Sequence, residues 1–377
     1  MTRAREIRRK WQRWVWCFFA INAVLMGSVI AFVLAVDPYQ IYHRVLGGRQ
    51  RFDLRIQRFY VPGMARTSDY GVALVGTSML QNIPNSAVQR YCGERAVNLC
   101  MSGASIHEEA QAMALALKHR GTKTVIATLD YNSLSGGSLN QVVGITFPFP
   151  SYLYDDSPLD KFPYLLSWDS IVTSYRAVYE DASPEETENA DWPWKFPPSM
   201  TFDAADAVRD IDPANINKKY GMMNLKLADM EKAFADNIFP LLEKDRNVRI
   251  HFVFPPYSIL VWHDYAQRDQ VRTYFAFKKW LVTQSERFGN FDVVDFQDRA
   301  DIITNLSLYA DIYHSAESID EQMVQSACAG KGLLDRGNIE MRQAGLLQLI
   351  RVTDPAALVE KARGQSAGSS RGSVATP

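Results

Sequence analysis

A stretch of 23 residues without a charged side chain, Trp14–Val36, constrains this chain more than any other feature. As a helix it would rise about 34 Å at ~1.5 Å per residue, enough to cross a hydrocarbon core of about 30 Å. A buried helix of a soluble protein rarely lacks charge on every face over such a length. The stretch therefore predicts a transmembrane helix over residues 15–36. Asp37-Pro38 should end it, because proline disfavours helical geometry in the preceding residue.

The residues before this stretch carry a concentrated positive charge. Residues 1–14 contain six basic side chains and a single acidic one. Because basic flanks remain on the cytoplasmic side of a span, they predict a cytoplasmic tail and place everything after Asp37 outside the cytoplasm. We therefore expect a single-pass protein of the bacterial inner membrane with a periplasmic domain. A cleavable signal peptide is the alternative, because small residues lie near the end of the stretch. The stretch is longer than the ~7–15 apolar residues of a signal core, which favours a retained anchor.

Composition and motif content exclude several classes of function. Basic residues number 41 and acidic residues 42, so the net charge of −1 provides no general attraction for nucleic acid. The sequence lacks GxGxxG, the GxxxxGK phosphate loop and HExxH, and no two of its six histidines have the spacing of metal ligands on a helix. We expect no nucleic-acid partner, no cofactor and no metal.

Alternating apolar runs and amphipathic segments predict an α/β domain over residues 70–350. Apolar runs typical of buried parallel strands occur at 70–77, 96–101, 123–129, 248–255 and 291–296. Helical patterns occur at 106–119, 222–244, 265–288 and 316–325. Strand, helix and strand in this order form a βαβ unit, which implies a parallel sheet covered by helices. Residues 37–69 are interpreted as a membrane-proximal linker.

Two segments differ in character from the rest of the domain. Residues 140–215 are rich in proline and aromatic residues and interrupt the alternation of strands and helices. They could form a lid or binding loop, or an excursion that packs its aromatic side chains on the domain. Residues 351–377 end in small polar residues from Gly364 onward and are predicted to be a disordered tail.

Four cysteines are compatible with an oxidising compartment. Cys17 lies within the apolar stretch, which leaves Cys92, Cys100 and Cys328 outside the membrane. These three allow at most one intrachain disulfide, and Cys92–Cys100 is the local candidate. Alternatively, Cys100 is a small core residue within the apolar run that contains it.

A serine at the end of the first predicted strand is the first candidate for chemistry. Ser78 follows Val75-Gly76-Thr77, and ligands of open parallel sheets bind beyond the carboxyl ends of the strands. Backbone N–H groups at a following helix would stabilise an oxyanion there. Taken alone, the serine could equally be a helix N-cap.

An acid and a histidine follow the last predicted strand. A nucleophilic serine needs a base, and the base needs an orienting acid. Asp311 and His314 have a spacing at which the carboxylate can reach one ring nitrogen while the other faces the cleft. Without the serine, the histidine could be a surface residue with an incidental aspartate nearby.

The combination of Ser78, the Asn98–Ser105 segment and the late DxxH motif resembles the SGNH hydrolase superfamily, the GDSL-type esterases. The resemblance covers residues 70–320 and implies a flavodoxin-like, three-layer α/β/α domain. It also implies Ser78 as the nucleophile, His314 as the base and Asp311 as its acid partner. Gly103 would supply a backbone oxyanion donor, and Asn132 would supply the side-chain donor.

This chain departs from the family pattern at two positions. Thr77 stands where the family typically has aspartate, and the segment around Asn132 reads Leu-Asp-Tyr-Asn-Ser rather than Gly-x-Asn-Asp. The anchor, variant serine block, aromatic insertion and late DxxH look closest to the divergent envelope branch of the superfamily. That branch includes the membrane-anchored protein of teichoic-acid D-alanylation and relatives that handle acetyl groups on exopolysaccharides.

The resemblance implies an extracytoplasmic serine esterase or O-acyltransferase that acts on an envelope or secreted glycan. Aromatic residues within 147–196 could stack on sugar rings, and partners could include other proteins of the same polysaccharide system. The alternatives are an inactive SGNH-fold glycan-binding or assembly protein, and a plain anchored scaffold. The acyl group, the acceptor, the choice between hydrolysis and transfer, and the oligomeric state are left open by the sequence.

Overall fold

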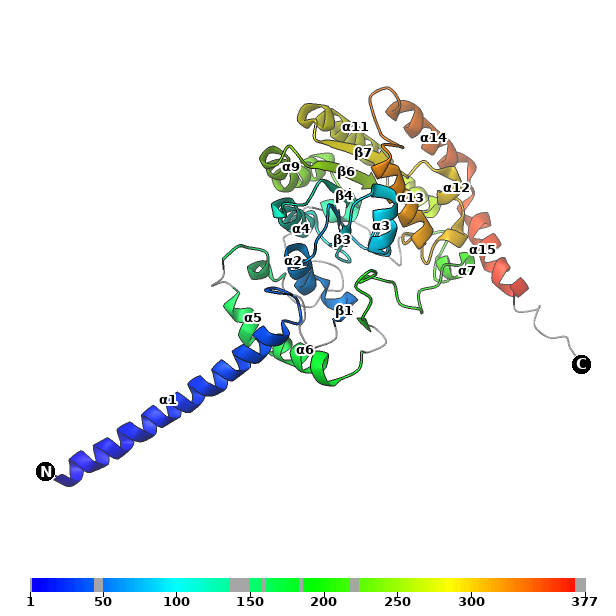
Figure 1. The fold of residues 1–377 in the computed structure, drawn as a ribbon. Coiled ribbons are helices and arrows are strands. Elements are labelled where there is room, and N and C mark those ends of the chain that lie inside the picture. The colour runs from blue at the N-terminus through cyan, green and yellow to red at the C-terminus, as the bar shows by residue number, and fades with distance from the viewer. Residues whose placement is uncertain are drawn as a thin grey trace, which may run out of the picture.

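The computed structural model describes residues 2–43, 50–135, 149–157, 161–182, 186–216 and 224–369. A five-stranded sheet in the order β3-β2-β4-β6-β7 forms its centre, and all neighbouring strands run parallel (Figure 1). The strands are β2 (Val72–Val75), β3 (Ala96–Asn98), β4 (Thr124–Thr128), β6 (Arg249–Phe254) and β7 (Phe291–Asp295). The prediction of an α/β domain with a parallel sheet is confirmed.

Helices cover both faces of this sheet because both faces are apolar. In β2, Ala73 and Val75 belong to one buried cluster, whereas Val72 and Leu74 belong to the other. The first cluster includes residues of α4 (Ile106–Lys118), α9 (Leu227–Lys244) and α11 (Val271–Phe288). The second includes residues of α3 (Asn85–Cys92) and α13 (Glu317–Cys328). This two-sided burial explains why the strands read as continuous apolar runs.

The chain begins with α1 (Thr2–Val36), which is long and apolar enough to cross a membrane. Its last turns contact α5 (Phe162–Leu166) and α6 (Trp168–Tyr179), and Val33 and Val36 are buried there. Helix α1 ends as predicted before Asp37, which takes a left-handed φ of 46°, and the Asp37 carboxylate accepts hydrogen bonds from the backbone N–H groups of Ile41 and Tyr42. The same carboxylate accepts a 2.7 Å bond from the Tyr164 hydroxyl, so α1 and α5 are joined at this point.

The segment interpreted as a linker, residues 37–69, is folded into the domain where it is described. It contains β1 (Phe52–Asp53), which pairs with β5 (Glu186–Thr187), and α2 (Gln57–Thr67), which contacts α4. Most of α2 is buried. The arginine-rich composition of this segment predicted exposure to solvent. Arg58 is buried nevertheless, because Glu108 pairs with it inside the domain.

The insertion at 140–215 packs on the domain through part of its length, while residues 140–148 lie outside the described residues. The Trp194 side chain is fully buried, and its indole N–H donates a 2.8 Å hydrogen bond to the Asn98 carbonyl. Described elements of the insertion are η3 (Ser151–Leu153), α5, α6, β5 and α7 (Ala204–Ala207). Around Trp194, the insertion is therefore a packed excursion.

Two expectations about helices need correction. The predicted helix at 265–288 is two helices, α10 (Ile259–Gln267) and α11, separated where Asp269 takes a left-handed φ of 55°. The predicted disordered tail, 351–377, contains α15 (Pro355–Ser369), which contacts α7 and buries Val359 and Ala362. Residues 370–377, and residues 222–223 of the predicted helix 222–244, lie outside the described residues.

The other helices in the described part of the chain are η1 (Leu54–Ile56), η2 (Tyr131–Leu134), α12 (Ala300–Ile303), η4 (Leu306–Leu308) and α14 (Ile339–Val352).

The disulfide joins Cys92 to Cys328, not to Cys100. Cys92 ends α3 and Cys328 ends α13, and these helices pack side by side on one face of the sheet. Their Cα atoms are 5.2 Å apart, a separation that suits a disulfide. Cys100 is a buried free thiol in the same cluster, so the core interpretation of Cys100 is confirmed and the Cys92–Cys100 pairing is wrong.

We expect Cys92→Ser, Cys328→Ser and the double variant to lower the free energy of unfolding by the same ~2–5 kcal/mol, because each removes one bond that closes a long loop. Denaturant unfolding of the detergent-solubilised protein measures this. Cys17→Ser, at an exposed position of α1, is the matched control and should leave stability unchanged. If only one of the two single variants had a much lower free energy of unfolding, the Cys92–Cys328 pairing would be contradicted.

Candidate active site

The structure brings together three of the predicted site residues. Ser78 and His314 are 236 positions apart, yet the Ser78 hydroxyl lies 2.8 Å from the His314 Nε2. The His314 Nδ1 lies 2.7 Å from a carboxylate oxygen of Asp311. Because an ionised carboxylate only accepts hydrogen bonds, the Nδ1 carries the proton and the Nε2 is free to accept one from the serine. This is the arrangement that a serine nucleophile requires.

The loop that carries the acid and the base is fixed by the acid itself. The second Asp311 oxygen accepts hydrogen bonds from the backbone N–H groups of Tyr313 and His314, at 2.7 and 2.8 Å. The Ala310 N–H donates to the His314 carbonyl at 2.9 Å, which closes the turn. One carboxylate therefore holds both the loop and the imidazole orientation.

Electrostatics within this pair are strongly coupled. Burial opposes ionisation of Asp311, but the hydrogen bonds from the His314 ring and the loop backbone outweigh it and lower the pKa of Asp311 to about 2. Burial also opposes the charged form of His314, but Asp311 and the nearby Asp130 outweigh that effect and raise the pKa of His314. About a quarter of each side chain of the pair remains exposed, so a substrate can reach them.

The serine turn depends on a glycine. Gly76 has a φ of 143°, and a Cβ at this position would lie 2.0 Å from the Thr128 hydroxyl oxygen. That close approach lets the Thr77 N–H donate to the same oxygen at 3.3 Å. The turn is thereby fastened to β4, and Ser78 is held beyond the end of β2.

Two backbone amides, that of Ser78 and that of Gly103, have no protein acceptor among the described residues. Gly103 has a φ of 58° and lies in the turn after β3. The Met101 N–H donates to the Gly76 carbonyl at 2.8 Å, which joins the two turns. Amides that remain unpaired beside a nucleophile are suited to an oxyanion.

The second segment that supports Gly103 comes from α2. The Gln57 side chain accepts a 2.7 Å hydrogen bond from the Ser102 N–H. Arg58 donates to the Ser102 carbonyl at 3.3 Å and forms a buried ion pair with Glu108, 2.7 Å at its closest. Sequence reasoning missed these residues, because they lie in the segment interpreted as a linker.

Neither Asn132 nor Gly103 is joined to Ser78, His314 and Asp311 by a described direct contact. The two differ in their exposed groups, and Asn132 is the predicted side-chain donor. Its side chain is exposed, and the hydrogen bonds described for it are backbone ones: its N–H donates to Asp130 at 2.9 Å, and its carbonyl accepts from the Ser135 N–H at 3.2 Å. Its predicted role as the side-chain oxyanion donor stays a prediction.

Asp130 is the site residue that sequence reasoning missed. The Tyr257 hydroxyl donates to its carboxylate at 2.8 Å, and the Thr77 hydroxyl lies at 3.5 Å. Burial raises the pKa of Asp130 despite these hydrogen bonds. Asp130 therefore places a second carboxylate, just after β4, beside Thr77 of the serine turn. The only available signal was the position of Asp130 directly after a predicted strand.

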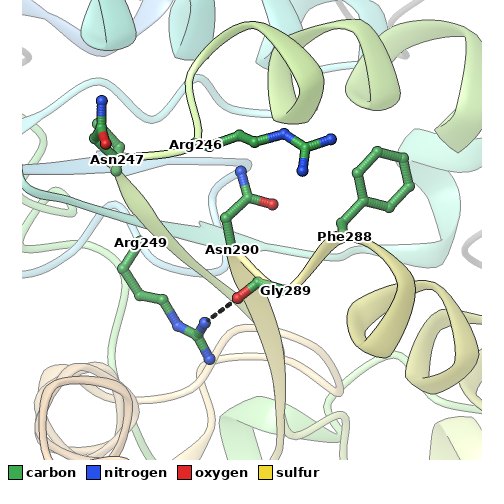
Figure 2. Close-up of a pocket in the computed structure, with 7 residues that line it drawn as sticks. Arg246, Asn247, Arg249, Phe288, Gly289 and Asn290 are labelled. Carbon is green, nitrogen blue, oxygen red and sulfur yellow. Dashed lines mark hydrogen bonds between the residues drawn. The ribbon is translucent and has the colours of Figure 1, made fainter.

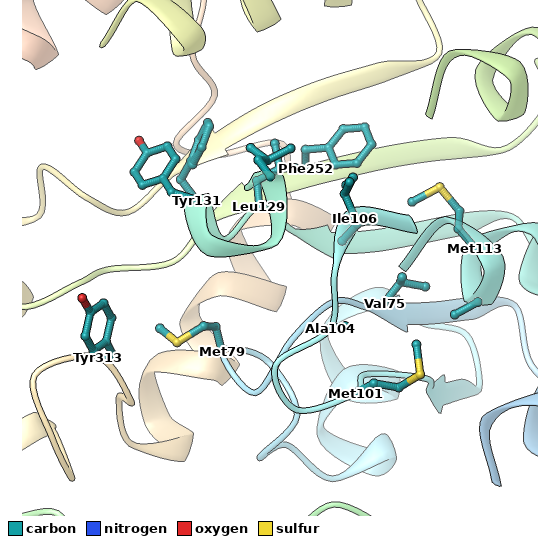
Figure 3. Close-up of a cluster of buried hydrophobic side chains, with 14 of the residues drawn as sticks. Val75, Met79, Met101, Ala104, Ile106, Met113, Leu129, Tyr131, Phe252 and Tyr313 are labelled. Carbon is teal, nitrogen blue, oxygen red and sulfur yellow. The ribbon is translucent and has the colours of Figure 1, made fainter. Parts of the chain in front are cut away.

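Apolar and aromatic side chains surround the serine and histidine. Met79 and Tyr313, adjacent to Ser78 and His314, belong to the buried cluster that Figure 3 shows together with Ala104 and Tyr131. The Phe196 ring, from the insertion, meets the His314 ring edge to face at a centroid distance of 5.7 Å. The insertion therefore contributes a wall of the site as well as packing on the domain.

A separate cavity of about 370 Å³ lies at the opposite ends of the strands (Figure 2). It is lined by Arg246–Arg249 and Phe288–Asn290, which precede or begin β6 and β7. The Arg249 side chain there is already paired with Asp292 and with the Gly289 carbonyl. The residues around Ser78 come from the carboxyl ends of the strands, so this cavity is not part of that site. Among the described residues, no group of three acidic, histidine or cysteine side chains could hold a metal ion.

Comparison with known proteins adds no relative: neither the family models nor the curated proteins match this sequence. The functional argument therefore depends on the residues and their geometry.

We expect the rate at which a fluorophosphonate modifies Ser78 to rise with pH through the raised pKa of His314, because only the neutral imidazole can accept the serine proton. Asp311→Asn removes the charge that raises this pKa, so the midpoint should move to lower pH. The maximal rate should also fall, by up to about 10⁴-fold, because the tautomer is lost.

Asp292→Asn is the matched control for this experiment. Asp292 pairs with His251 at 2.7 Å, away from Ser78, and its replacement should leave the pH profile of the labelling unchanged. If the midpoint of the pH profile were the same in Asp311→Asn as in the unmodified protein, Asp311 would not be the group that raises the pKa of His314.

Proposed function

We propose that this protein is a membrane-anchored, extracytoplasmic serine esterase or O-acyltransferase of the SGNH type that acts on an envelope or secreted glycan. The observation that carries the proposal is the continuous chain of hydrogen bonds from Ser78 through His314 to Asp311. A parallel sheet with helices on both faces is compatible with the flavodoxin-like α/β/α fold of that superfamily.

The proposed reaction begins with attack of the Ser78 oxygen on the acyl carbonyl carbon, while the His314 Nε2 accepts the hydroxyl proton. The Ser78 and Gly103 amides stabilise the oxyanion of the tetrahedral intermediate. The leaving alcohol then takes the proton from His314, and an acyl-enzyme remains on Ser78. A water or a sugar hydroxyl next loses its proton to His314 and attacks the ester, which releases the acyl group and restores the serine.

The surroundings of the serine favour a small acyl group on a larger polar acceptor. Met79 and Phe196 restrict the apolar space beside the reacting groups. The insertion adds a further aromatic ring next to Phe196, because the Phe202 ring stacks on it at a centroid distance of 6.4 Å. Aromatic faces of this kind are suited to sugar rings, and other proteins of a polysaccharide system would be the natural partners.

An inactive glycan-binding or assembly protein is the second candidate. The observation that favours it is that the exposed Asn132 side chain has no described contact with Ser78 or His314, so the backbone amides are the oxyanion donors on which the proposed site depends. Loss of one such donor typically reduces the rate ~10²–10³-fold.

A fluorophosphonate separates these two candidates. We expect a single covalent adduct on Ser78, identified by mass spectrometry of the peptide, that is absent from Ser78→Ala and strongly reduced in His314→Ala. Ser318→Ala, an exposed serine in the helix after His314, is the matched control and should label normally. In ester hydrolysis, the double variant should lose little more than either single variant, because the residues act as a unit. Absence of an adduct on the folded protein would favour the binding protein.

The proposed topology has its own test. A reporter that is active only outside the cytoplasm, fused after Pro377, should be active, because the basic residues precede α1. Activity of a cytoplasmic reporter at the same position would overturn the location and the glycan substrate. A mature protein that begins near Val36 would show that α1 is a cleaved signal.

A further inference from the structure

Helix α6 presents its large apolar side chains to the outside and its small side chains to the domain. Trp168, Tyr175 and Tyr179 are 76%, 52% and 67% exposed, and Val178 is exposed beside them. Ser170, Ser174 and Ala177 form the buried face. A helix on the surface of a soluble domain has the reverse arrangement, with its apolar side chains against the core.

The exposed large apolar residues of α6 form one continuous stripe. At ~100° per residue, Trp168, Tyr175, Val178 and Tyr179 fall within about 100° of the helix circumference. The charged residues of α6 lie outside this stripe, and Arg176 is occupied by ion pairs with Glu180 and Glu186. Exposed Phe162 on the neighbouring α5 adds a further aromatic ring. A charge-free surface rich in aromatics requires an apolar or interfacial environment.

The position of α6 identifies that environment. Helices α5 and α6 contact the last turns of α1, where α1 leaves the domain (Figure 1). The Tyr39 hydroxyl lies 3.1 Å from the Thr173 hydroxyl, and Tyr164 donates to Asp37, so the junction is fixed by side-chain contacts. The 23 uncharged residues of α1 slightly exceed the ~20 needed to cross the hydrocarbon core. Residues 33–36 would therefore lie at its outer boundary, at the same level as α5 and α6.

We propose that the outer face of α6, together with Phe162, lies in the headgroup region of the bilayer that α1 spans. Tyrosine and tryptophan favour this region because their rings are apolar at one end and polar at the other. The lipid surface would cover the exposed stripe, and the domain would sit against the membrane in one orientation. This surface depends on the proposed membrane insertion of α1 but not on the proposed esterase activity.

Spin labels on the full-length protein test this contact. In a Cys17→Ser background, Cys100 is buried and the other two cysteines are bonded, so Tyr175→Cys provides one reactive thiol. The labelled protein is reconstituted into phosphatidylethanolamine–phosphatidylglycerol vesicles. Collisions of the nitroxide with oxygen, which enters lipid, are compared with collisions with a water-soluble nickel chelate. Met341→Cys on α14 is the matched control, because Met341 is 71% exposed and α14 is remote from α1 in Figure 1.

We expect oxygen collisions to dominate at position 175 and nickel collisions to dominate at position 341. Equal nickel accessibility at the two positions would overturn the proposal. A low nickel accessibility at position 175 that rises when the protein is diluted with excess lipid would also overturn the proposal. In that case a second copy of the protein, and not the lipid, would cover the stripe. Protein that fails to float with the vesicles would overturn the insertion of α1 and the surface with it. Failure of Ser78 to react with a fluorophosphonate would leave the surface intact.

Discussion

The parallel direction of the five strands is the constraint on which the rest of this structure depends. Parallel strands send all of their carboxyl ends to one edge, so residues far apart in the chain meet there. Ser78 follows β2, Gly103 follows β3, Asp130 follows β4 and the loop with His314 follows β7. Parallel strands also need cover on both faces, which brings α3 and α13 together and allows the Cys92–Cys328 disulfide.

At this edge of the sheet, the pKa values of two carboxylates, Asp311 and Asp130, are shifted in opposite directions because their environments differ. Asp311 accepts hydrogen bonds from an imidazole and two backbone amides, which stabilises its charge and lowers its pKa. Burial raises the pKa of Asp130, because its carboxylate is bonded to the Asn132 backbone N–H and the neutral Tyr257 hydroxyl but to no imidazole, and these bonds do not outweigh the burial. Both carboxylates favour the protonated form of His314. The site is therefore prepared for an imidazolium, the species that forms when a serine gives up its proton.

Local patterns in the sequence were sufficient for the sheet and for the pairing of Asp311 with His314, because apolar runs and a three-residue spacing are visible within a few positions. The contact of Ser78 with His314 spans 236 positions and was expected only from the resemblance to a family. The remaining features depend on distant contacts. Cys328 pairs with Cys92 because two helices pack together, and no local signal marks that choice. The polar composition of residues 37–69 concealed α2, whose Arg58 is buried only because Glu108 faces it. The disorder predicted for the tail is wrong in its described part for the same reason, since α15 is held by contacts with α7.

Helix α2 also connects α1, the proposed membrane anchor, to the candidate active site. Tyr39, just beyond α1, packs edge to face against Tyr60 of α2 at a centroid distance of 5.0 Å. One turn earlier in α2, Gln57 and Arg58 hold Ser102 beside Gly103. Packed side chains of this kind transmit position, because a well-packed interior does not deform continuously. The orientation of α1 and α6 at the membrane would therefore fix the height of the proposed oxyanion site above the lipid.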